Sequence, residues 1–391
     1  MAVVHLARVT GDDAYGGVVA LKTIHPHLAA HAQFVDMFLD EARIASTIAH
    51  PNVCRVQDFG EHDGVYYLAM EYLIGEPLDE VIAALALGAD NAQLEVLPYH
   101  AAAIVLEVCE GLHAAHELRD RDGAWLGVVH RDVSPQNVFV GYDGNVKIVD
   151  FGLAKAARRL TQTRAGTIKG KLAYVSPEAL QRAPIDRRAD VWATGVCLWE
   201  LLTGQRLFKR PTDLETLVAV RDARIQAPSS VAWWVPPGLD AIVLRALARD
   251  PARRYSSSSD MARDLRRFLT NAGWAVEPHE TARFMLDLFG EARRKQHIAL
   301  IEHAIGEPLF DEPEPEQYDD RESGPVVCVP PLRVSPEDLT RRRRKPRRRL
   351  GRVLMIAAAG ILAAAAGFAA YTAVGSAVGD VPIRPPLAAQ P

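Results

Sequence analysis

Residues 130–152 have the sequence HRDVSPQNVFVGYDGNVKIVDFG, and they say more about this chain than any other stretch. Asn137 and Asp150 offer the hard oxygen ligands that Mg²⁺ prefers in proteins. Asp132 adds a third oxygen-bearing side chain, five residues before Asn137. Each short motif occurs by chance in many proteins, so the interpretation depends on what else the chain carries and in what order.

Further motifs precede and follow this stretch. Lys22 ends a strand-like segment, and Glu41 lies in the helical segment that comes next. Later come Ser-Pro-Glu at 176–178, Asp190 at the start of DVWATG, and Arg254 in DPARRY. The order and spacing of all these motifs resemble the bacterial eukaryotic-like Ser/Thr protein kinase family, over residues 1 to about 270.

Hydrophobic periodicity divides that region in two. Segments 3–9, 17–24 and 66–73 are strand-like, and residues 34–48 have apolar side chains at helical spacing. From about residue 78 onward the pattern is mostly helical. The chain is therefore expected to form a small β-rich lobe followed by a larger α-helical lobe. The resemblance implies the bilobal α+β protein-kinase fold.

The resemblance also implies a phosphoryl-transfer reaction, which depends on positioning and charge stabilisation more than on covalent chemistry. Lys22 then supplies a cation for the α- and β-phosphates of ATP, and Glu41 holds Lys22 in place. Asp132 accepts or orients the proton of a hydroxyl group on the protein substrate. Asn137 and Asp150 bind Mg²⁺, for which Mn²⁺ is an alternative.

A site for the adenine base follows from the same resemblance. The side chains of Val4, Ala20 and Phe139 enclose the ring, although without the resemblance these would be ordinary core residues. The backbone of Glu71 and Leu73, in the hinge between the lobes, meets the edge of the base.

Two polar residues are expected to support the fold. Asp190 braces the backbone of the loop that carries Asp132, and Arg254 pairs with Glu178. Neither Asp190 nor Arg254 is expected to touch a substrate.

The N-terminus departs from the family. The family has a glycine-rich loop, G-x-G-x-x-G-x-V, and Val4 aligns with its last valine. The glycines, whose backbone N–H groups close over phosphates, are missing before Val4. Nucleotide binding is therefore expected to be weaker, unless the true start lies upstream of Met1. The alternative is a catalytically weak or dead pseudokinase that acts as a scaffold.

A second departure is a pair of changes in the cleft. Ser/Thr kinases usually carry Lys two residues after the catalytic Asp, where this chain has Ser134. They also usually carry Thr in a G-T-x-x-Y pattern, where this chain has Lys171. We expect Lys171 to act catalytically by bringing its ammonium group to the γ-phosphate region, because a flexible point charge can serve from either side. The alternative is that Lys171 faces solvent and position 134 tolerates Ser.

Candidate regulatory residues lie in the activation segment, residues 150–178. Thr161, Thr163 and Thr167 stand there among basic side chains. In the family, an arginine at the position of Arg131 commonly grips a phosphate on this segment and orders it. Autophosphorylation at one of the three threonines is therefore expected.

The chain continues beyond the kinase resemblance. Residues 271–305 have an amphipathic helical pattern, which favours packing against the large lobe, with a homodimer or partner surface as the alternative. Residues 306–340 are acidic and proline-rich and are expected to form an extended linker.

A membrane segment is expected after the linker. Residues 341–352 carry the basic run RRRRKPRRR, and the 22 residues 353–374 include no charge. Such a helix spans about 33 Å, enough for a bilayer core of about 30 Å. The basic flank favours the cytoplasmic side and contact with anionic lipids. We expect a single C-terminal transmembrane helix in the inner (cytoplasmic) membrane, a cytoplasmic kinase domain and a short extracytoplasmic tail, residues 375–391. The alternative is a buried core helix that follows a basic nucleic-acid-binding tail.

The composition excludes other classes of protein. The 391 residues carry a net charge of −4, with 49% apolar and 24% charged residues, which is typical of a globular chain. The near-neutral balance argues against nucleic acid as a partner. The four cysteines, Cys54, Cys109, Cys197 and Cys328, show no C-x-x-C spacing and so suggest no zinc knuckle.

Overall fold

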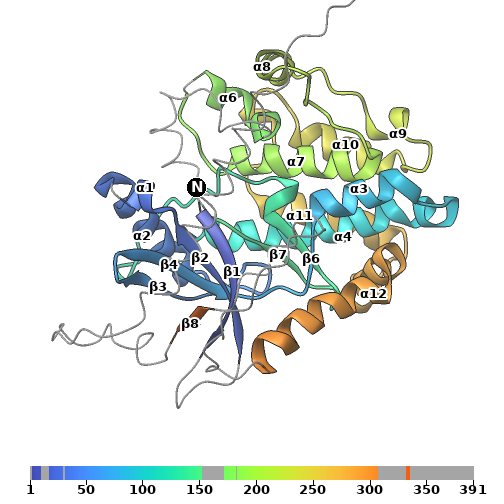
Figure 1. The fold of residues 1–391 in the computed structure, drawn as a ribbon. Coiled ribbons are helices and arrows are strands. Elements are labelled where there is room, and N and C mark those ends of the chain that lie inside the picture. The colour runs from blue at the N-terminus through green and yellow to red at the C-terminus, as the bar shows by residue number, and fades with distance from the viewer. Residues whose placement is uncertain are drawn as a thin grey trace, which may run out of the picture. The chain divides into compact units, whose positions relative to one another are not determined.

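The computed structural model describes residues 2–9, 17–29, 31–151, 171–181, 183–306 and 332–334. All of them belong to the first of the chain's two units, residues 1–340. They form a small lobe built on a β-sheet and a larger lobe built mostly of helices (Figure 1). The expected bilobal α+β fold is thereby confirmed for the described residues.

The small lobe is a β-sheet with two helices. Its elements are β1 (Ala2–Val9), β2 (Val18–Ile24), α1 (Pro26–Ala29), α2 (Ala32–Thr47), β3 (Val56–His62) and β4 (Val65–Glu71). The strand order is β3-β4-β2-β1-β8, and β8 (Leu332–Val334) pairs in parallel with β1. The other strand pairs in this sheet are antiparallel. Phe34, Phe38 and Ala42 of α2 repeat at helical spacing and share one buried cluster with Leu68 and Met70 of β4.

A second, three-stranded sheet follows the hinge. Its antiparallel order is β5-β6-β7, with β5 (Gly75–Pro77), β6 (Val138–Gly141) and β7 (Val146–Ile148). The 3₁₀ turn η1 (Pro135–Asn137) leads directly into β6. The loop 130–137 is therefore anchored at its C-terminal end by this sheet.

Helices make up most of the large lobe. They are α3 (Leu78–Gly88), α4 (Asn91–His116), α6 (Pro177–Leu180), α7 (Arg188–Thr203), α8 (Asp213–Asp222), α9 (Pro228–Val231), α10 (Gly238–Ala246) and α11 (Ser258–Asn271), with 3₁₀ turns η2 (Lys171–Tyr174) and η3 (Pro251–Arg253). Helix α4 begins with a capping box between Asp90 and Gln93. Helix α7 is buried from Ala189 to Thr203, and most of these side chains are apolar.

Helix α4 is the one described helix that is long and apolar enough to cross a bilayer. Its most apolar window is 61% buried inside the structure, as expected for the core helix of a globular domain. The predicted span, residues 353–374, lies outside the described residues.

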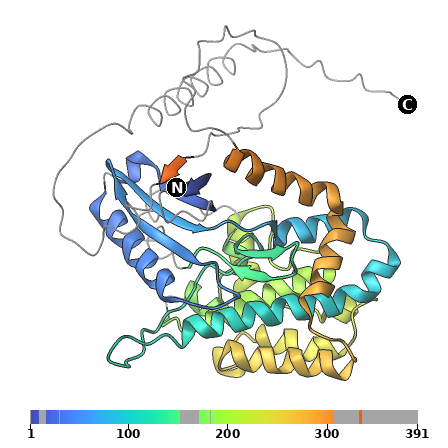
Figure 2. The ribbon, with the colours of Figure 1, turned by 90° about the horizontal axis from the view of Figure 1, so that it is seen from below.

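The last long helix is α12 (Pro278–Gly306), which lies in the predicted helical extension. Gly290 adopts φ 79° and ψ 158°, a conformation open mainly to glycine, and so divides α12 into two halves. Figure 2 shows α12 in orange, running past α3 and β6 toward β1. Packing on the large lobe was expected for this region, and the structure adds contacts with the small lobe.

Candidate active site

The loop that carries Asp132 is fixed from behind by one buried carboxylate. Asp190, at the start of α7, is 1% exposed and accepts hydrogen bonds from the backbone N–H groups of His130 and Arg131, both at 2.7 Å. His116 Nε2 lies 2.8 Å from the same carboxylate. Arg131 has a φ of 64°, and Asp190 holds this rare conformation in place. The prediction that Asp190 braces this loop is confirmed.

Electrostatics explain why Asp190 stays ionised. Burial alone would raise its pKa, but the hydrogen bond and charge of His116 and the N–H of Arg131 outweigh burial and lower the pKa. No short motif in the sequence pointed to His116, because it lies 74 residues before its partner.

Asp132 receives two donors at one oxygen. Its Oδ2 accepts a hydrogen bond from Asn137 Nδ2 at 2.9 Å and lies 2.5 Å from Lys171 Nζ. Asn137 Nδ2 also donates to the backbone carbonyl of Asp132 at 2.8 Å. The amide nitrogen of Asn137 is therefore committed to Asp132, which leaves its carbonyl oxygen for another ligand.

Lys171 and Ser134 differ sharply in their surroundings. The Lys171 side chain is 41% exposed and forms an ion pair with Asp132. Ser134 is 1% exposed, and its hydroxyl group has no hydrogen-bond partner within the described part of the chain. The ammonium group near Asp132 thus comes from position 171.

Lys22 and Asp150 meet across a long stretch of sequence. Lys22 Nζ lies 2.7 Å from Asp150 Oδ1, and the lysine side chain is only 8% exposed. Asp150 has a φ of 60°, another uncommon backbone conformation. Glu41 belongs to α2, but its side chain lies outside what the structure describes. The contact that the structure gives Lys22 is therefore with Asp150.

Phe151 packs against the same loop. Its ring lies 4.6 Å from that of His130, which is fully buried and whose Nε2 lies 3.1 Å from the carbonyl of Val149. Burial lowers the pKa of His130, so the ring is neutral near pH 7. Packing of these two rings joins the Asp132 loop to the residues after β7.

Strand register brings the predicted base-contacting residues together. Val4 pairs with Lys22, and Ala20 lies two residues before Lys22, so all three side chains share one face of the sheet. Met70 pairs with Ala20 on that face, next to the hinge. Val4 is 57% exposed, which leaves an apolar side chain free on this face.

The hinge and β6 carry the remaining predicted residues of this kind. Glu71 ends β4, and its side chain accepts hydrogen bonds from Lys147 Nζ and the N–H of Arg55, both at 2.7 Å. Leu73 follows two residues later, and Phe139 lies in β6. The backbone at the hinge is thus held by side-chain contacts behind it.

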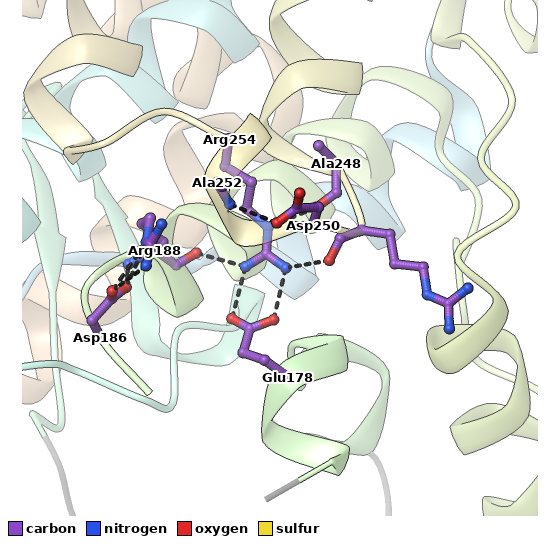
Figure 3. A network of polar contacts seen from close by, with 8 residues as sticks. Glu178, Asp186, Arg188, Ala248, Asp250, Ala252 and Arg254 are labelled. Carbon is purple, nitrogen blue, oxygen red and sulfur yellow. Dashed lines mark hydrogen bonds and ion pairs between the residues drawn. The ribbon is translucent and has the colours of Figure 1, made fainter. Parts of the chain in front are cut away.

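Glu178 and Arg254 form a buried bidentate pair (Figure 3). The two nitrogen–oxygen distances are 2.8 and 2.7 Å. Arg254 also donates to the backbone carbonyls of Arg188, Ala248 and Arg249. Burial would raise the pKa of Glu178, but the guanidinium group outweighs it and lowers the pKa. The predicted pairing is confirmed.

The donor set fits a hard divalent cation. Asp150 and Asn137 offer carboxylate and amide oxygens, the ligands that Mg²⁺ prefers. The described residues hold no group of three or more His, Cys, Asp or Glu that could bind a metal by themselves. Thr161, Thr163 and Thr167 lie outside the described residues.

Comparisons with known proteins agree with this geometry. A family model described as the protein kinase domain matches residues 7–265. The tyrosine-protein kinase MasK of Myxococcus xanthus is 40% identical over 295 residues, which cover 75% of this chain and 45% of MasK. The serine/threonine-protein kinase PrkC of Bacillus subtilis is 34% identical over 270 residues, or 68% of this chain and 38% of PrkC.

A third relative and a solved structure extend the comparison. The serine/threonine-protein kinase PknL of Mycobacterium tuberculosis is 36% identical over 63% of this chain and 58% of PknL. The crystal structure of the PknI kinase domain from the same organism matches with a TM-score of 0.50 and 27% identity, over 68% of this chain and 90% of that domain. The matched part spans less than half the length of MasK and PrkC.

Proposed function

The chain belongs to the bacterial eukaryotic-like Ser/Thr protein kinase family, and we propose that it transfers the γ-phosphoryl group of Mg-ATP to hydroxyl groups of proteins. One observation carries the proposal. Asp132 holds both an amide and an ammonium donor on one carboxylate oxygen, beside a loop braced by Asp190. A fixed carboxylate of this kind can orient a hydroxyl group and accept its proton.

Charge placement supports the same reaction. Lys22 is a buried cation on the same face of the sheet as the proposed base-contacting side chains of Val4 and Ala20, where it can neutralise the α- and β-phosphates. Glu41 is proposed as a second partner that keeps Lys22 in place. Asn137 and Asp150 would hold Mg²⁺, or Mn²⁺, which supplies charge neutralisation of the phosphates when bound.

Base binding completes the proposed nucleotide site. Val4 and Ala20 come from adjacent strands of the small lobe, and Phe139 comes from β6 of the large lobe. We assign them to the two faces of adenine. The backbone of Glu71 and Leu73 is assigned to its edge, which is the hydrogen-bonding side of the base.

A pseudokinase scaffold is not favoured. A scaffold has no use for a buried lysine paired with Asp150, nor for a carboxylate held by Asn137 and Lys171. Lys22 is buried, and a buried charge that lacks a function is costly, so its retention in this geometry supports catalysis.

The acceptor hydroxyl is proposed to be that of Ser or Thr, as in PrkC and PknL. MasK, which is 40% identical, bears the name of a tyrosine kinase, so Tyr is the second candidate. Phosphoamino-acid analysis of the labelled protein distinguishes the two, because phosphotyrosine and phosphoserine or phosphothreonine separate after acid hydrolysis.

The proposed activity is tested with the full chain. Purified protein is incubated with radiolabelled ATP, Mg²⁺ and a generic protein substrate, beside an Asp132→Asn variant. We expect labelling of the chain and of the substrate, reduced about 100-fold or more in the variant, because general-base catalysis contributes that much. Equal labelling by both proteins would contradict the assignment of Asp132.

Autophosphorylation is proposed within the activation segment. Thr161, Thr163 and Thr167 are the candidate acceptors, and Arg131, next to Asp132, is the proposed partner of the resulting phosphate. Mass spectrometry of the labelled chain tests this. Phosphate found only outside residues 150–178 would contradict it.

Membrane anchoring is proposed from the sequence. The uncharged span 353–374 would cross the inner membrane once, with the kinase domain on the cytoplasmic side of the basic segment 341–352. That segment is also the proposed contact with anionic lipids. A homodimer is a further proposal, with the exposed surface of residues 271–305 as its candidate.

A further inference from the structure

The second half of α12, residues 291–306, lies outside the core and contacts both lobes; we call it the lobe-spanning segment. The first half of α12 is embedded in the large lobe, where Phe284 stacks on His100 at 4.5 Å and Met285 is fully buried. Gly290 then redirects the chain. Figures 1 and 2 both show the helix continuing from the large lobe toward the end of β1.

Its attachment near the hinge is a buried carboxylate. Glu76 of β5 follows the hinge by three residues, and its side chain is 3% exposed. Arg293 Nε donates to Glu76 Oε1 at 2.8 Å, and Arg293 Nη2 approaches Oε2 at 3.3 Å. His297 Nε2 lies 3.1 Å from Oε1, and the Tyr142 hydroxyl donates to the same oxygen at 3.0 Å.

These donors keep Glu76 charged. Burial alone would raise the pKa of Glu76, but the hydrogen bonds from Arg293, His297 and Tyr142 outweigh burial and lower it. Removing one donor from a buried carboxylate leaves an uncompensated charge, so the strand that carries it must shift or admit water. Glu76 therefore passes any change in α12 to β5 and to the hinge.

The far end of the segment meets the small lobe. Arg8 of β1 donates to the backbone carbonyl of Ile305 at 2.5 Å. A guanidinium group there satisfies one of the free carbonyls at the C-terminus of a helix. Ala304 is 4% exposed, and α12 contacts both β1 and β2. The segment thus touches the strand that carries Val4 and the strand that carries Lys22.

We propose that the lobe-spanning segment sets the position of the hinge and the spacing of the two lobes, and that Arg293 and His297 are positioning residues for the nucleotide. They act through Glu76 and never touch the nucleotide themselves. This inference rests on the proposed ATP site. Its consequence is that nucleotide affinity depends on a helix that lies beyond residue 265, where the match to the kinase domain ends.

Arg293→Ala and Arg294→Ala form a matched pair of variants. Arg294 is the neighbouring residue on the same helix, and it pairs with Glu291, one turn earlier on that helix, at 3.1 Å. Each variant of the full chain is examined for the Kd of adenylyl imidodiphosphate with Mg²⁺, for KM and kcat with ATP, and for Tm. Arg293→Lys is the conservative variant, since it keeps the charge but loses the two-pronged contact.

We expect Arg293→Ala to raise Kd and KM for the nucleotide about three- to tenfold, with kcat changed less than about twofold. Arg293→Lys should lie between this variant and the unchanged protein, and Arg294→Ala should match the unchanged protein. A lower Tm for Arg293→Ala with unchanged Kd and KM would show a purely structural brace and overturn the proposal.

A second variant covers the case in which Arg293→Ala does not fold. Arg8→Ala removes an exposed contact at the other end of the segment, far from Glu76, and should raise Kd in the same direction by a smaller factor. An unchanged Kd in Arg8→Ala would then decide against the proposal. Because Kd is measured without turnover, a chain that binds nucleotide but transfers no phosphate would count against the proposed function and leave this test intact.

Discussion

At the scale of single residues, the presence of a cation beside Asp132 matters more than which position of the sequence supplies it. The family usually supplies it from position 134, two residues after the carboxylate. Here Ser134 is buried, and its hydroxyl group has no hydrogen-bond partner among the described residues. The carboxylate of Asp132 pairs instead with Lys171, which lies 39 residues later in the sequence. An ammonium group on a four-carbon stem can approach from either wall of the cleft, so we expect the two arrangements to be chemically equivalent.

Lys171→Ala is therefore expected to lower kcat by about 100-fold, with KM for ATP changed less than about threefold, because the charge acts mainly on the transferring phosphoryl group. Steady-state kinetics of the full chain measure both constants. The double variant Ser134→Lys/Lys171→Ala returns the cation to its usual position and should recover at least about tenfold of the loss. An unchanged kcat in Lys171→Ala would contradict the role.

The buried side chain of His100 should make the stability of the fold depend on pH. It is 4% exposed, stacks on Phe284 and meets Trp274 edge-on at 5.0 Å. Burial lowers the pKa of His100 from 6.5 to about 4. The unfolded chain therefore takes up a proton below about pH 6.5 that the folded chain refuses until about pH 4, so stability is lost as the pH falls through this window.

As the pH falls from 6.5 to 4, protonation of His100 in the unfolded chain should lower the unfolding free energy by up to about 1.4 kcal/mol per pH unit. His100→Phe keeps an aromatic ring without the titrating group, so it should flatten this slope. Urea unfolding of both proteins at pH 7.5, 6 and 5 measures the difference. Parallel curves for the two proteins would contradict the assignment to His100, since other buried histidines such as His130 are common to both.

At the scale of elements, periodicity predicted those with a clear pattern. The segments 3–9, 17–24 and 66–73 are β1, β2 and β4, and residues 34–48 contain most of α2. Strand β3, VQDFGEH, was missed because polar side chains dominate it, and it is held by pairing with β4. The mostly helical pattern expected from about residue 78 onward is interrupted after His116, where α4 ends and a bridge joins Arg119 to Trp125.

Site residues were predictable where a motif fixed their spacing. The motifs predicted that Asp190 supports the loop and that Arg254 pairs with Glu178. They did not predict His116 or Glu76, because both act through partners that lie far away in sequence and belong to no short pattern. The only signal for Glu76 in the sequence was a single charged residue among the uncharged neighbours at 72–78.

The pair of Arg254 and Glu178 joins two elements, α6 and the turn after η3. Arg254→Ala leaves Glu178 as a buried carboxylate and frees three backbone carbonyls, so we expect a loss of about 3–5 kcal/mol in unfolding free energy. Arg249→Ala is the control, because that side chain is exposed. Chemical denaturation measures both. Equal stability of the two variants would show that the pair contributes no net energy.

At the scale of the whole molecule, two chain segments within the described residues run from one lobe to the other: the hinge and α12. The hinge lies at the proposed base site, and α12 contacts β1 and β2. The sequence showed an amphipathic helix here but could not show which lobe it would cover, because Gly290 changes its course. We therefore expect nucleotide binding and lobe spacing to depend on the chain up to residue 306.

The same chain runs on to the predicted membrane span. Residues 353–374 carry no charge and follow nine basic or proline residues, 341–349, so length, hydropathy and flanking charge all favour a single crossing. Its alanine and glycine content makes insertion only moderately favourable, and two central charges should abolish it. Each arginine at the centre of a span costs about 2.5–3.5 kcal/mol on the insertion scale.

We therefore expect the full chain to stay with the membrane pellet after extraction with alkaline carbonate, and Leu362→Arg/Ala366→Arg to be released. Leu362→Ile/Ala366→Val is the matched control, because it alters the same positions without adding charge, and it should stay in the pellet. Because the kinase domain precedes the basic segment, protease added to inverted vesicles should digest it, whereas intact spheroplasts should protect it. Release of the unchanged chain by carbonate would rule out the span and leave the basic segment as a surface contact with anionic lipid.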